Sequence, residues 1–287
     1  MDKLRRIAAV LLATASLLFG SSAALAAPVT QLGFALDGSG SVSSADYNLL
    51  RSGLSDAIAS LPQNGTVEII IVSYGSGVSV VSNPVVLTAA TLPIIQAALA
   101  SHTKAGGGTD TAAAITRLTA LMTGSVNFAD PGTQSIINLA TDGVPNSQAA
   151  AVAAAAAAAA AGIDALSIEA IGTGVANATA LANMVAIAFP GPATILAVNS
   201  TNIPNPIGGS WVVPVSNFNA LAPILLAKVQ AAIIPPPTGV PEPGSMALVG
   251  LALAAMLAFN RRQRRSGGRS DDSARNQNLG MLQPVAC

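Results

Sequence analysis

Cysteine, histidine and aromatic side chains are almost absent from this 287-residue chain. Its only cysteine is Cys287, its only histidine is His102, and 3 % of its residues are aromatic. Because no second cysteine exists to pair with Cys287, the stability of the chain must come from a hydrophobic core and not from internal disulfides. A zinc site with the usual cysteine and histidine ligands is excluded for the same reason.

Charged residues are also scarce, at 9 % of the chain, and their two signs are unevenly distributed. Residues 27–233 contain four basic and nine acidic side chains, which gives this segment a net charge of −5. Proteins that bind nucleic acid need a surplus of lysine and arginine to neutralise phosphates, so we expect no nucleic-acid partner. The length of the segment suits one sizeable domain.

The first 26 residues are typical of a secretory signal peptide. A basic start at residues 3–6 precedes an apolar core at residues 7–19, and a small-x-small cleavage sequence follows at residues 24–26. The alternative is an uncleaved membrane anchor, but an apolar core of this length is short for crossing a bilayer. We therefore predict that the protein is exported.

The carboxyl-terminal part has three segments of different composition. Residues 234–244 form a proline-rich linker, for which we expect an extended conformation. Residues 245–265 combine an uncharged, mostly apolar stretch with an arginine cluster, which fits a membrane helix whose basic end lies in the cytoplasm. A buried amphipathic helix is the alternative for this stretch. The polar residues 266–287 are predicted to be disordered.

The order of these segments resembles a known sorting signal. Pro241, Glu242 and Pro243, followed by the apolar stretch and the arginines, resemble the PEP-CTERM signal of exopolysaccharide-producing Gram-negative bacteria. The resemblance implies processing by a membrane enzyme, exosortase, at or near the Pro-Glu-Pro motif, after export through the inner membrane and transient anchoring by the helix. It also implies a final location at the cell surface or outside the cell. The family signal normally ends soon after the arginines, whereas 22 residues follow them here.

Strand-like and helix-like segments alternate between the two ends. Strands are predicted at residues 29–37, 66–74, 78–87, 134–142, 163–172 and 210–215. Helices are predicted at residues 44–61, 91–101, 110–123, 146–162, 178–188 and 218–232.

This alternation predicts a three-layer α/β fold, with a mostly parallel central sheet and helices on both of its faces. The second and third strands form a hairpin across Gly75-Ser76-Gly77, which makes one edge strand antiparallel. The alanine-rich segment 146–162 is expected to be a helix closed by Gly162, with a flexible low-complexity segment as the alternative.

Oxygen-bearing side chains cluster at the predicted strand ends. Asp37 ends the first strand and is followed by Ser39 and Ser41, Asp142 ends the strand 134–142, and Thr109 follows three glycines. Ligands of open α/β sheets bind at the carboxyl ends of the strands, so we expect these five side chains to meet there. Such hard oxygen donors suit Mg²⁺, Mn²⁺ or Ca²⁺, and two carboxylates leave the ion under-neutralised, with at least one replaceable position.

Each of these residues also has an ordinary structural interpretation. The serines suit a turn, Asp37 an Asx-turn or helix cap, Asp142 an Asp-Gly turn, and Thr109 the cap of the next helix. Asp110 is interpreted as a first-turn helix charge, and His102 as a solvated loop residue.

Three motifs at these positions resemble a known binding site. Asp-x-Ser-x-Ser at 37–41, Gly-Thr-Asp-Thr at 108–111 and Thr-Asp-Gly at 141–143 are similar to the metal-ion-dependent adhesion site of von Willebrand factor type A domains. The resemblance extends over the segment 27–233 and implies the Rossmann-like fold of that family.

The resemblance also implies how the metal is held. Ser39, Ser41 and Thr109 would ligate it directly, and Asp37 and Asp142 would act largely through bound water and hydrogen bonds. A carboxylate from a protein ligand would complete the coordination, because an under-neutralised divalent ion attracts an acidic group more strongly than a neutral one.

Three functions are compatible with the residues. We expect a metal-dependent protein-binding or adhesion module, and the alternative is a structural component of an exopolysaccharide or biofilm matrix that needs no metal. A hydrolase is disfavoured because Gly38-Ser39-Gly40 lacks the Gly-x-Ser-x-Gly elbow and His102 is the only histidine. We therefore expect no enzymatic activity.

Overall fold

A computed structural model describes residues 30–233. The predicted signal peptide, proline-rich linker, membrane helix with its arginine cluster and polar tail all lie outside these residues. Within residues 30–233, no helix is both long and apolar enough to span a membrane.

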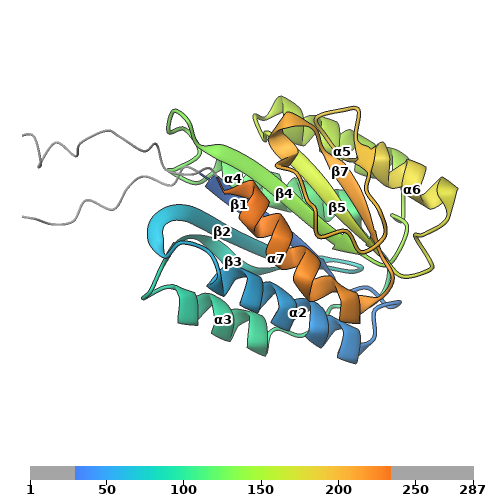
Figure 1. Ribbon diagram of the computed structural model, residues 1–287, viewed down its shortest axis with the longest axis horizontal. Helices are drawn as coiled ribbons and strands as arrows, with labels where there is room; N and C mark the ends of the chain where they lie inside the picture. Colours follow the sequence, from blue (N-terminus) through green and yellow to red (C-terminus); the bar gives the residue numbers. More distant parts are fainter. Residues whose placement is uncertain (1–29, 234–287) are drawn as a thin grey trace, which may run out of the picture. The chain divides into compact units, whose positions relative to one another are not determined.

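The centre of the domain is a seven-stranded sheet in the order β3-β2-β1-β4-β5-β7-β6 (Figure 1). Its strands are β1 (Thr30–Asp37), β2 (Asn64–Tyr74), β3 (Val78–Thr88), β4 (Gln134–Thr141), β5 (Ala165–Ile171), β6 (Thr194–Ile195) and β7 (Trp211–Val215). Only the pairing of β2 with β3 is antiparallel, so β3 is the predicted antiparallel edge strand. The predicted fold class is confirmed.

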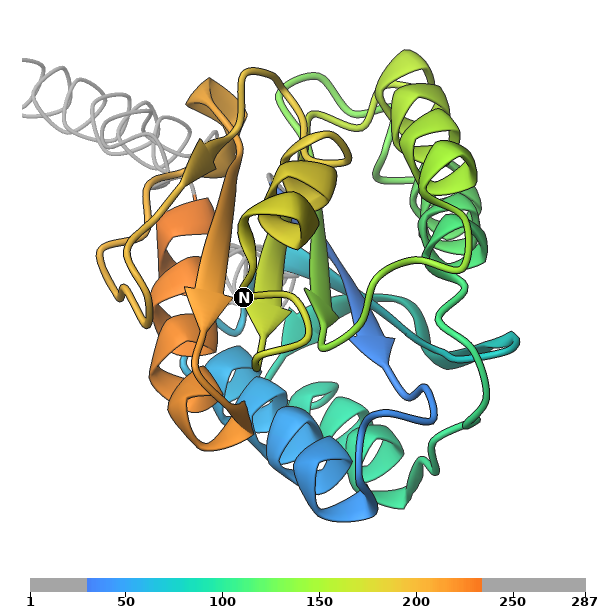
Figure 2. The same cartoon turned by 90° about the vertical axis from the view of Figure 1, so that its right-hand side faces the viewer.

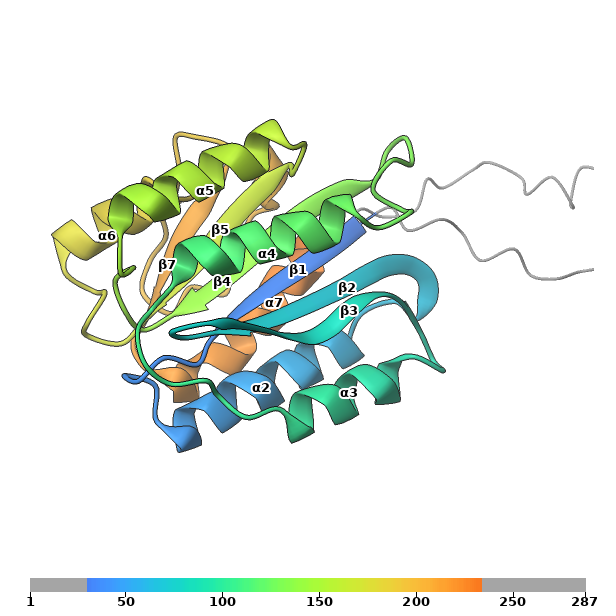
Figure 3. The ribbon, with the colours of Figure 1, turned by 180° about the vertical axis from the view of Figure 1, so that it is seen from behind.

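Six helices cover the sheet in two groups. They are α2 (Ser44–Ala59), α3 (Leu92–Ser101), α4 (Thr111–Thr123), α5 (Gln148–Ala160), α6 (Ala178–Val185) and α7 (Leu221–Ala232). Figures 1 and 3 show α2, α3 and α7 on one face and α4, α5 and α6 on the other. Each face has its own cluster of buried apolar side chains, so the hydrophobic core lies in two layers on either side of the sheet.

The alanine-rich segment is a regular helix, as predicted. Ser147 caps α5 by accepting a hydrogen bond from the backbone N–H of Ala150, and the buried residues Ala151, Ala155 and Ala158 recur at helical spacing. The small side chains allow α5 to lie close to α4 and the sheet.

Several elements differ from the prediction, and one of them is α7, which begins at Leu221 and not at residue 218. β6 was not predicted, because two exposed residues leave no readable periodicity; backbone bonds to β7 alone define the strand. Helix α6 ends at Val185 instead of residue 188. Phe189, which precedes Pro190, instead pairs its backbone with that of Leu166 in β5.

One ion pair is buried between the sheet and α7. Glu169 of β5 and Lys228 of α7 are in direct contact, and both side chains are only 1 % exposed. Neither charged group has another hydrogen-bond partner within residues 30–233, although the Lys228 ammonium lies 5.3 Å from the centroid of the Trp211 ring. Burial raises the pKa of Glu169 and lowers the pKa of Lys228, and the opposite charge of the partner counteracts each shift.

The burial of the Glu169–Lys228 ion pair leads to a prediction about the stability of the domain. Replacing Lys228 with methionine leaves the carboxylate buried without its cation and should lower the free energy of unfolding in urea by about 3–5 kcal/mol. The deficit should be smaller in acidic buffer, because a raised pKa allows Glu169 to take a proton in the folded state, and that stabilisation is lost as the pH rises through the folded pKa.

The double variant Glu169→Leu with Lys228→Met should recover most of the loss, since it removes both charges. Arg117→Met, on the exposed side of α4, is the matched control and should leave unfolding unchanged. A Lys228→Met variant as stable as the original at neutral pH would show that the ion pair contributes nothing.

Candidate metal centre

The candidate site lies at the carboxyl ends of the parallel strands. Figure 2 shows β1, β4, β5 and β7 pointing toward the same end of the domain, where the chain turns into the loops that carry the predicted oxygen ligands. Residues Leu36 and Ala140 are paired in the β1–β4 register, so the next residues along, Asp37 and Thr141, lie side by side. The sheet topology therefore brings the first and third motifs together.

Asp37 is fully buried and joins the two strand ends. One carboxylate oxygen accepts a hydrogen bond from the backbone N–H of Ser39 at 2.9 Å, and the other accepts one from the Thr141 hydroxyl at 2.7 Å. The first bond bends the chain into the loop that carries the serines. Asp37 thus fixes both the β1–α2 loop and the end of β4, as an Asx-turn residue that also links two strands.

The serine hydroxyls continue this connection to the second carboxylate. The Ser39 and Ser41 hydroxyl oxygens lie 3.0 Å apart, and the Ser41 hydroxyl donates to Asp142 at 2.7 Å. Four of the five predicted side chains, from two loops about a hundred residues apart in sequence, therefore belong to one cluster.

Thr109, the fifth predicted residue, lies beside Ser41 and the Asp142–Gly143 turn. A Cβ atom placed on Gly143 would lie 3.1 Å from the Thr109 hydroxyl oxygen and 3.8 Å from the Ser41 hydroxyl oxygen. Glycine at position 143 therefore leaves open a space bordered by two of the hydroxyls.

The glycine-rich segment before Thr109 approaches the serine loop closely. Gly106 and Gly107 have φ values of 74° and 77°, which favour glycine. The Gly106 N–H donates to the Gly38 carbonyl at 2.8 Å, and the Gly40 N–H donates to the Gly107 carbonyl at 2.7 Å. A Cβ on Gly75 would lie 2.2 Å from the Gly106 carbonyl oxygen. The backbone of this glycine-rich segment therefore lies directly against the loop that carries the serines.

The electrostatic surroundings disfavour a bare negative charge at the cluster. Desolvation raises the pKa of Asp142, and the neighbouring Asp37 carboxylate adds to the increase, while the hydrogen bond from Ser41 opposes it. A bound cation is the kind of partner that would relieve this repulsion.

Two interpretations of single residues were wrong. Asp110, and not Thr109, is the cap of α4, since its carboxylate accepts a hydrogen bond from the Ala113 N–H at 3.1 Å. His102 follows α3 and is partly exposed, but its side chain does not lie free in solvent. Its Nδ1 lies 2.9 Å from the Tyr47 hydroxyl and its Nε2 lies 2.9 Å from the Ser79 hydroxyl, which fixes the ring between α2 and β3.

Sequence reasoning also missed two side chains that hold the loops in place. The Lys104 ammonium donates to the backbone carbonyls of Ser39, at 3.0 Å, and Val42. The Asn146 side-chain oxygen accepts from the Thr109 N–H at 2.8 Å, and the Asn146 N–H donates to the Thr109 carbonyl at 2.9 Å. The only signal was that both residues border a motif, which does not reveal what a side chain contacts.

The chemistry of the cluster fits a hard cation. Within residues 30–233, no group of three or more histidine, cysteine or acidic side chains is placed to hold a metal ion. A cation site in this part of the chain must therefore use other oxygen donors as well. The cluster offers three hydroxyls and two carboxylates, which are hard ligands of the kind that Mg²⁺, Mn²⁺ and Ca²⁺ prefer.

The structural neighbours among solved proteins share this fold. A zinc-occupied form of proximal thread matrix protein 1 from the mussel byssus superposes with a TM-score of 0.52 at 16 % identity, over 71 % of this chain and 46 % of that one. The pilus adhesin SpaC of Lactobacillus rhamnosus GG gives 0.54 at 16 % identity, over 71 % and 30 %. BatB of Bacteroides thetaiotaomicron gives 0.50 at 17 % identity, over 71 % and 98 %.

This chain thus spans less than half the length of the mussel protein and about a third of the pilus adhesin. No curated protein matches the sequence. Two family models do match, the von Willebrand factor type A domain over residues 31–204 and the PEP-CTERM protein-sorting motif over residues 239–265. The chain therefore belongs to the von Willebrand factor type A domain family and carries a PEP-CTERM sorting motif near its carboxyl-terminal end.

Proposed function

We propose that the protein is an exported adhesion module that binds a protein ligand through a divalent metal ion. The observation that carries the proposal is the convergence of Asp37, Ser39, Ser41 and Asp142 in one hydrogen-bonded cluster, with the Thr109 hydroxyl beside it. Membership of the von Willebrand factor type A family and the zinc-occupied adhesion site of the mussel protein both support a divalent cation at this position.

Each residue has a distinct role in this proposal. Ser39, Ser41 and Thr109 would hold the metal directly, whereas Asp37 and Asp142 would act largely through water and hydrogen bonds. When bound, the ion supplies a positive charge that a carboxylate of the ligand neutralises. We favour Mg²⁺, with Mn²⁺ or Ca²⁺ as substitutes, because the donor set contains only hard oxygens.

The sorting motif supports a location outside the cytoplasm. We propose that Pro241, Glu242 and Pro243 mark the place where an exosortase-type enzyme processes the protein, after transient anchoring by the carboxyl-terminal apolar segment. The mature domain then acts at the cell surface or in the extracellular matrix, where exopolysaccharide is a second candidate partner. Residues 241–243 lie outside the described part of the chain.

The arrangement of His102 favours binding over catalysis. Both of its ring nitrogens are engaged, one by Tyr47 and the other by Ser79, and it is the only histidine in the chain. A general base of the usual type is therefore missing from the described residues around the serines, and we propose that the protein is not an enzyme.

Asp142→Asn is the sharpest test of the metal site. The change keeps the shape of the side chain but removes the charge that orients metal-bound water, so Mn²⁺ affinity should fall about 10- to 100-fold. Electron paramagnetic resonance of free Mn²⁺ measures this directly, with Mg²⁺ competition as the second readout. Asp130→Asn, in an exposed loop, is the matched control and should bind like the original protein. Equal affinity in the two variants would refute the assignment of Asp142.

Chelation tests the adhesion function and separates it from a purely structural matrix role. A pull-down from the matrix of the producing bacterium should retain a protein partner with Mg²⁺ and lose it with EDTA, because the ligand carboxylate then has no ion to bind. Circular dichroism should show the fold intact in EDTA, since two clusters of buried apolar side chains hold the described domain together. A partner retained equally in EDTA would favour the metal-independent structural role.

A further inference from the structure

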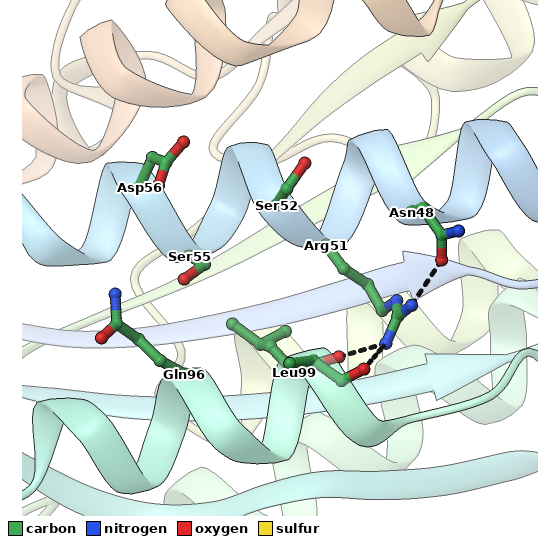
Figure 4. A pocket seen from close by; sticks show the side chains of 8 residues that line it. Asn48, Arg51, Ser52, Ser55, Asp56, Gln96 and Leu99 are labelled. Atoms are coloured by element: carbon green, nitrogen blue, oxygen red, sulfur yellow. Dashed lines mark hydrogen bonds between the residues drawn. The ribbon is translucent and has the colours of Figure 1, made fainter.

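A polar pocket lies next to the candidate metal centre, on the side of α2. Its volume is about 270 Å³, and its walls include Tyr47, Arg51, His102 and Lys104. The Lys104 ammonium contacts the carbonyls of Ser39 and Val42, so the pocket shares a wall with the loop that carries the serine ligands. A second cavity of about 330 Å³ continues from Arg51 between α2 and α3 (Figure 4).

The pocket holds two of the three basic side chains that have no ion-pair partner within residues 30–233. Of the four basic residues in segment 27–233, Lys228 is paired with Glu169 and Arg117 is exposed on α4, across the sheet. The other two, Arg51 and Lys104, both line the pocket. Lys228–Glu169 is the only ion pair within 4 Å in the described part of the chain, so neither Arg51 nor Lys104 has a carboxylate partner there. This is unexpected in a domain where acidic residues outnumber basic ones nine to four.

Neutral acceptors hold both cations in place without cancelling their charge. Arg51 donates to the backbone carbonyls of Leu99 and Ala100 at the end of α3 and to the Asn48 side chain, as Figure 4 shows. Lys104 is held by the backbone carbonyls of Ser39 and Val42, in the loop that carries the serines. Charged groups that are already positioned lose little conformational entropy when they bind an anion. The charge of Arg51 also acts inside the pocket. The pKa of His102 is lowered mainly by desolvation and further by the positive charge of Arg51.

We propose that this pocket is an anion subsite that binds a second carboxylate of the protein ligand. The inference rests on the proposed function, in which the first carboxylate of that ligand binds the metal. An acidic ligand is repelled by a domain of net charge −5, and Arg51 and Lys104 reverse that repulsion at the rim of the metal centre. The partner surface should therefore present two acidic side chains. Tyr47 is only 2 % exposed and offers no face on which a sugar ring could stack, which favours a protein over a polysaccharide.

The single histidine allows the subsite to be tested without metal. Sulfate, a small divalent anion, is titrated into the full chain, prepared without a histidine tag and kept in EDTA, while NMR follows the His102 imidazole. Sulfate should shift this resonance saturably and raise the pKa of His102, because a nearby anion stabilises the imidazolium form. Chloride at the same ionic strength should do neither beyond ordinary screening.

Matched variants identify the groups responsible. Arg51→Gln and Lys104→Gln should each weaken sulfate binding at least about fivefold, since each removes one of two charge-assisted contacts. Arg51→Lys keeps the charge and should retain most of the binding, and circular dichroism checks that α3 is intact in both Arg51 variants. Arg117→Gln is the control and should match the original chain. No saturable shift with sulfate, or an equal loss in Arg117→Gln, would overturn the proposal.

A peptide-binding experiment tests whether the anion subsite binds the protein ligand. It also separates failure of the anion subsite from failure of the proposed metal-dependent function. With Mn²⁺ bound, a short peptide with two acidic residues should bind at least about tenfold more tightly than its counterpart with one, and Lys104→Gln should erase the difference. Equal binding of the two peptides, or tighter binding of an oligouronate, would contradict the assignment to a two-acid protein ligand. If Mn²⁺ does not bind at all, the proposed function fails, whereas the sulfate titration in EDTA still decides whether the anion subsite exists.

Discussion

The site depends on one buried carboxylate, that of Asp37. Its two hydrogen bonds, to the Ser39 N–H and the Thr141 hydroxyl, join the ends of two adjacent parallel strands before any ligand arrives. A charged group without solvent is costly to bury unless its oxygens are bonded, so these contacts must form for β1 and β4 to end where they do. The serine loop then follows from the position of Asp37, and the Ser41–Asp142 contact follows from both. The hydrogen bonds of Asp37 therefore determine both the stability and the geometry of the site at this edge of the sheet.

The buried acidic side chains of the described residues are stabilised by different kinds of partner. Asp37 uses a backbone N–H and the hydroxyl of Thr141, whereas Glu68 accepts hydrogen bonds from three neutral side-chain groups at the opposite end of β2. Glu169 alone is neutralised by a cation, Lys228. Neutral donors leave a carboxylate with a net negative charge at its position, whereas a lysine partner cancels that charge across the pair. Only the first arrangement would suit the proposed metal site, and Asp37, at the start of the loop that carries Ser39 and Ser41, has it.

The strands of the fold and the convergence of oxygen-bearing side chains at their carboxyl ends could be predicted from the sequence, because both depend on local patterns. Short apolar runs located β1 and β4, and a parallel sheet brings their carboxyl ends together whatever the intervening residues are. The contacts of Lys104 and Asn146 were not predictable in this way, since a long or amide side chain reaches a partner that only the folded loops define. His102 was misassigned for the same reason: its two hydroxyl partners come from α2 and β3.

The candidate metal centre and the neighbouring pocket need charges of opposite sign on the two sides of the loop that carries Ser39 and Ser41. The cation requires a concentration of negative oxygens, which Asp37 and Asp142 provide, while an acidic ligand requires that this negative charge be locally offset. Lys104 contacts the loop through carbonyl oxygens and not through the carboxylate of Asp37 or Asp142. It therefore contributes positive charge at the rim of the candidate metal centre without neutralising these carboxylates. A direct ion pair with Asp142 would have weakened both functions. The separation of the two charges by a layer of backbone would allow the proposed metal ion and the proposed acidic partner to bind side by side.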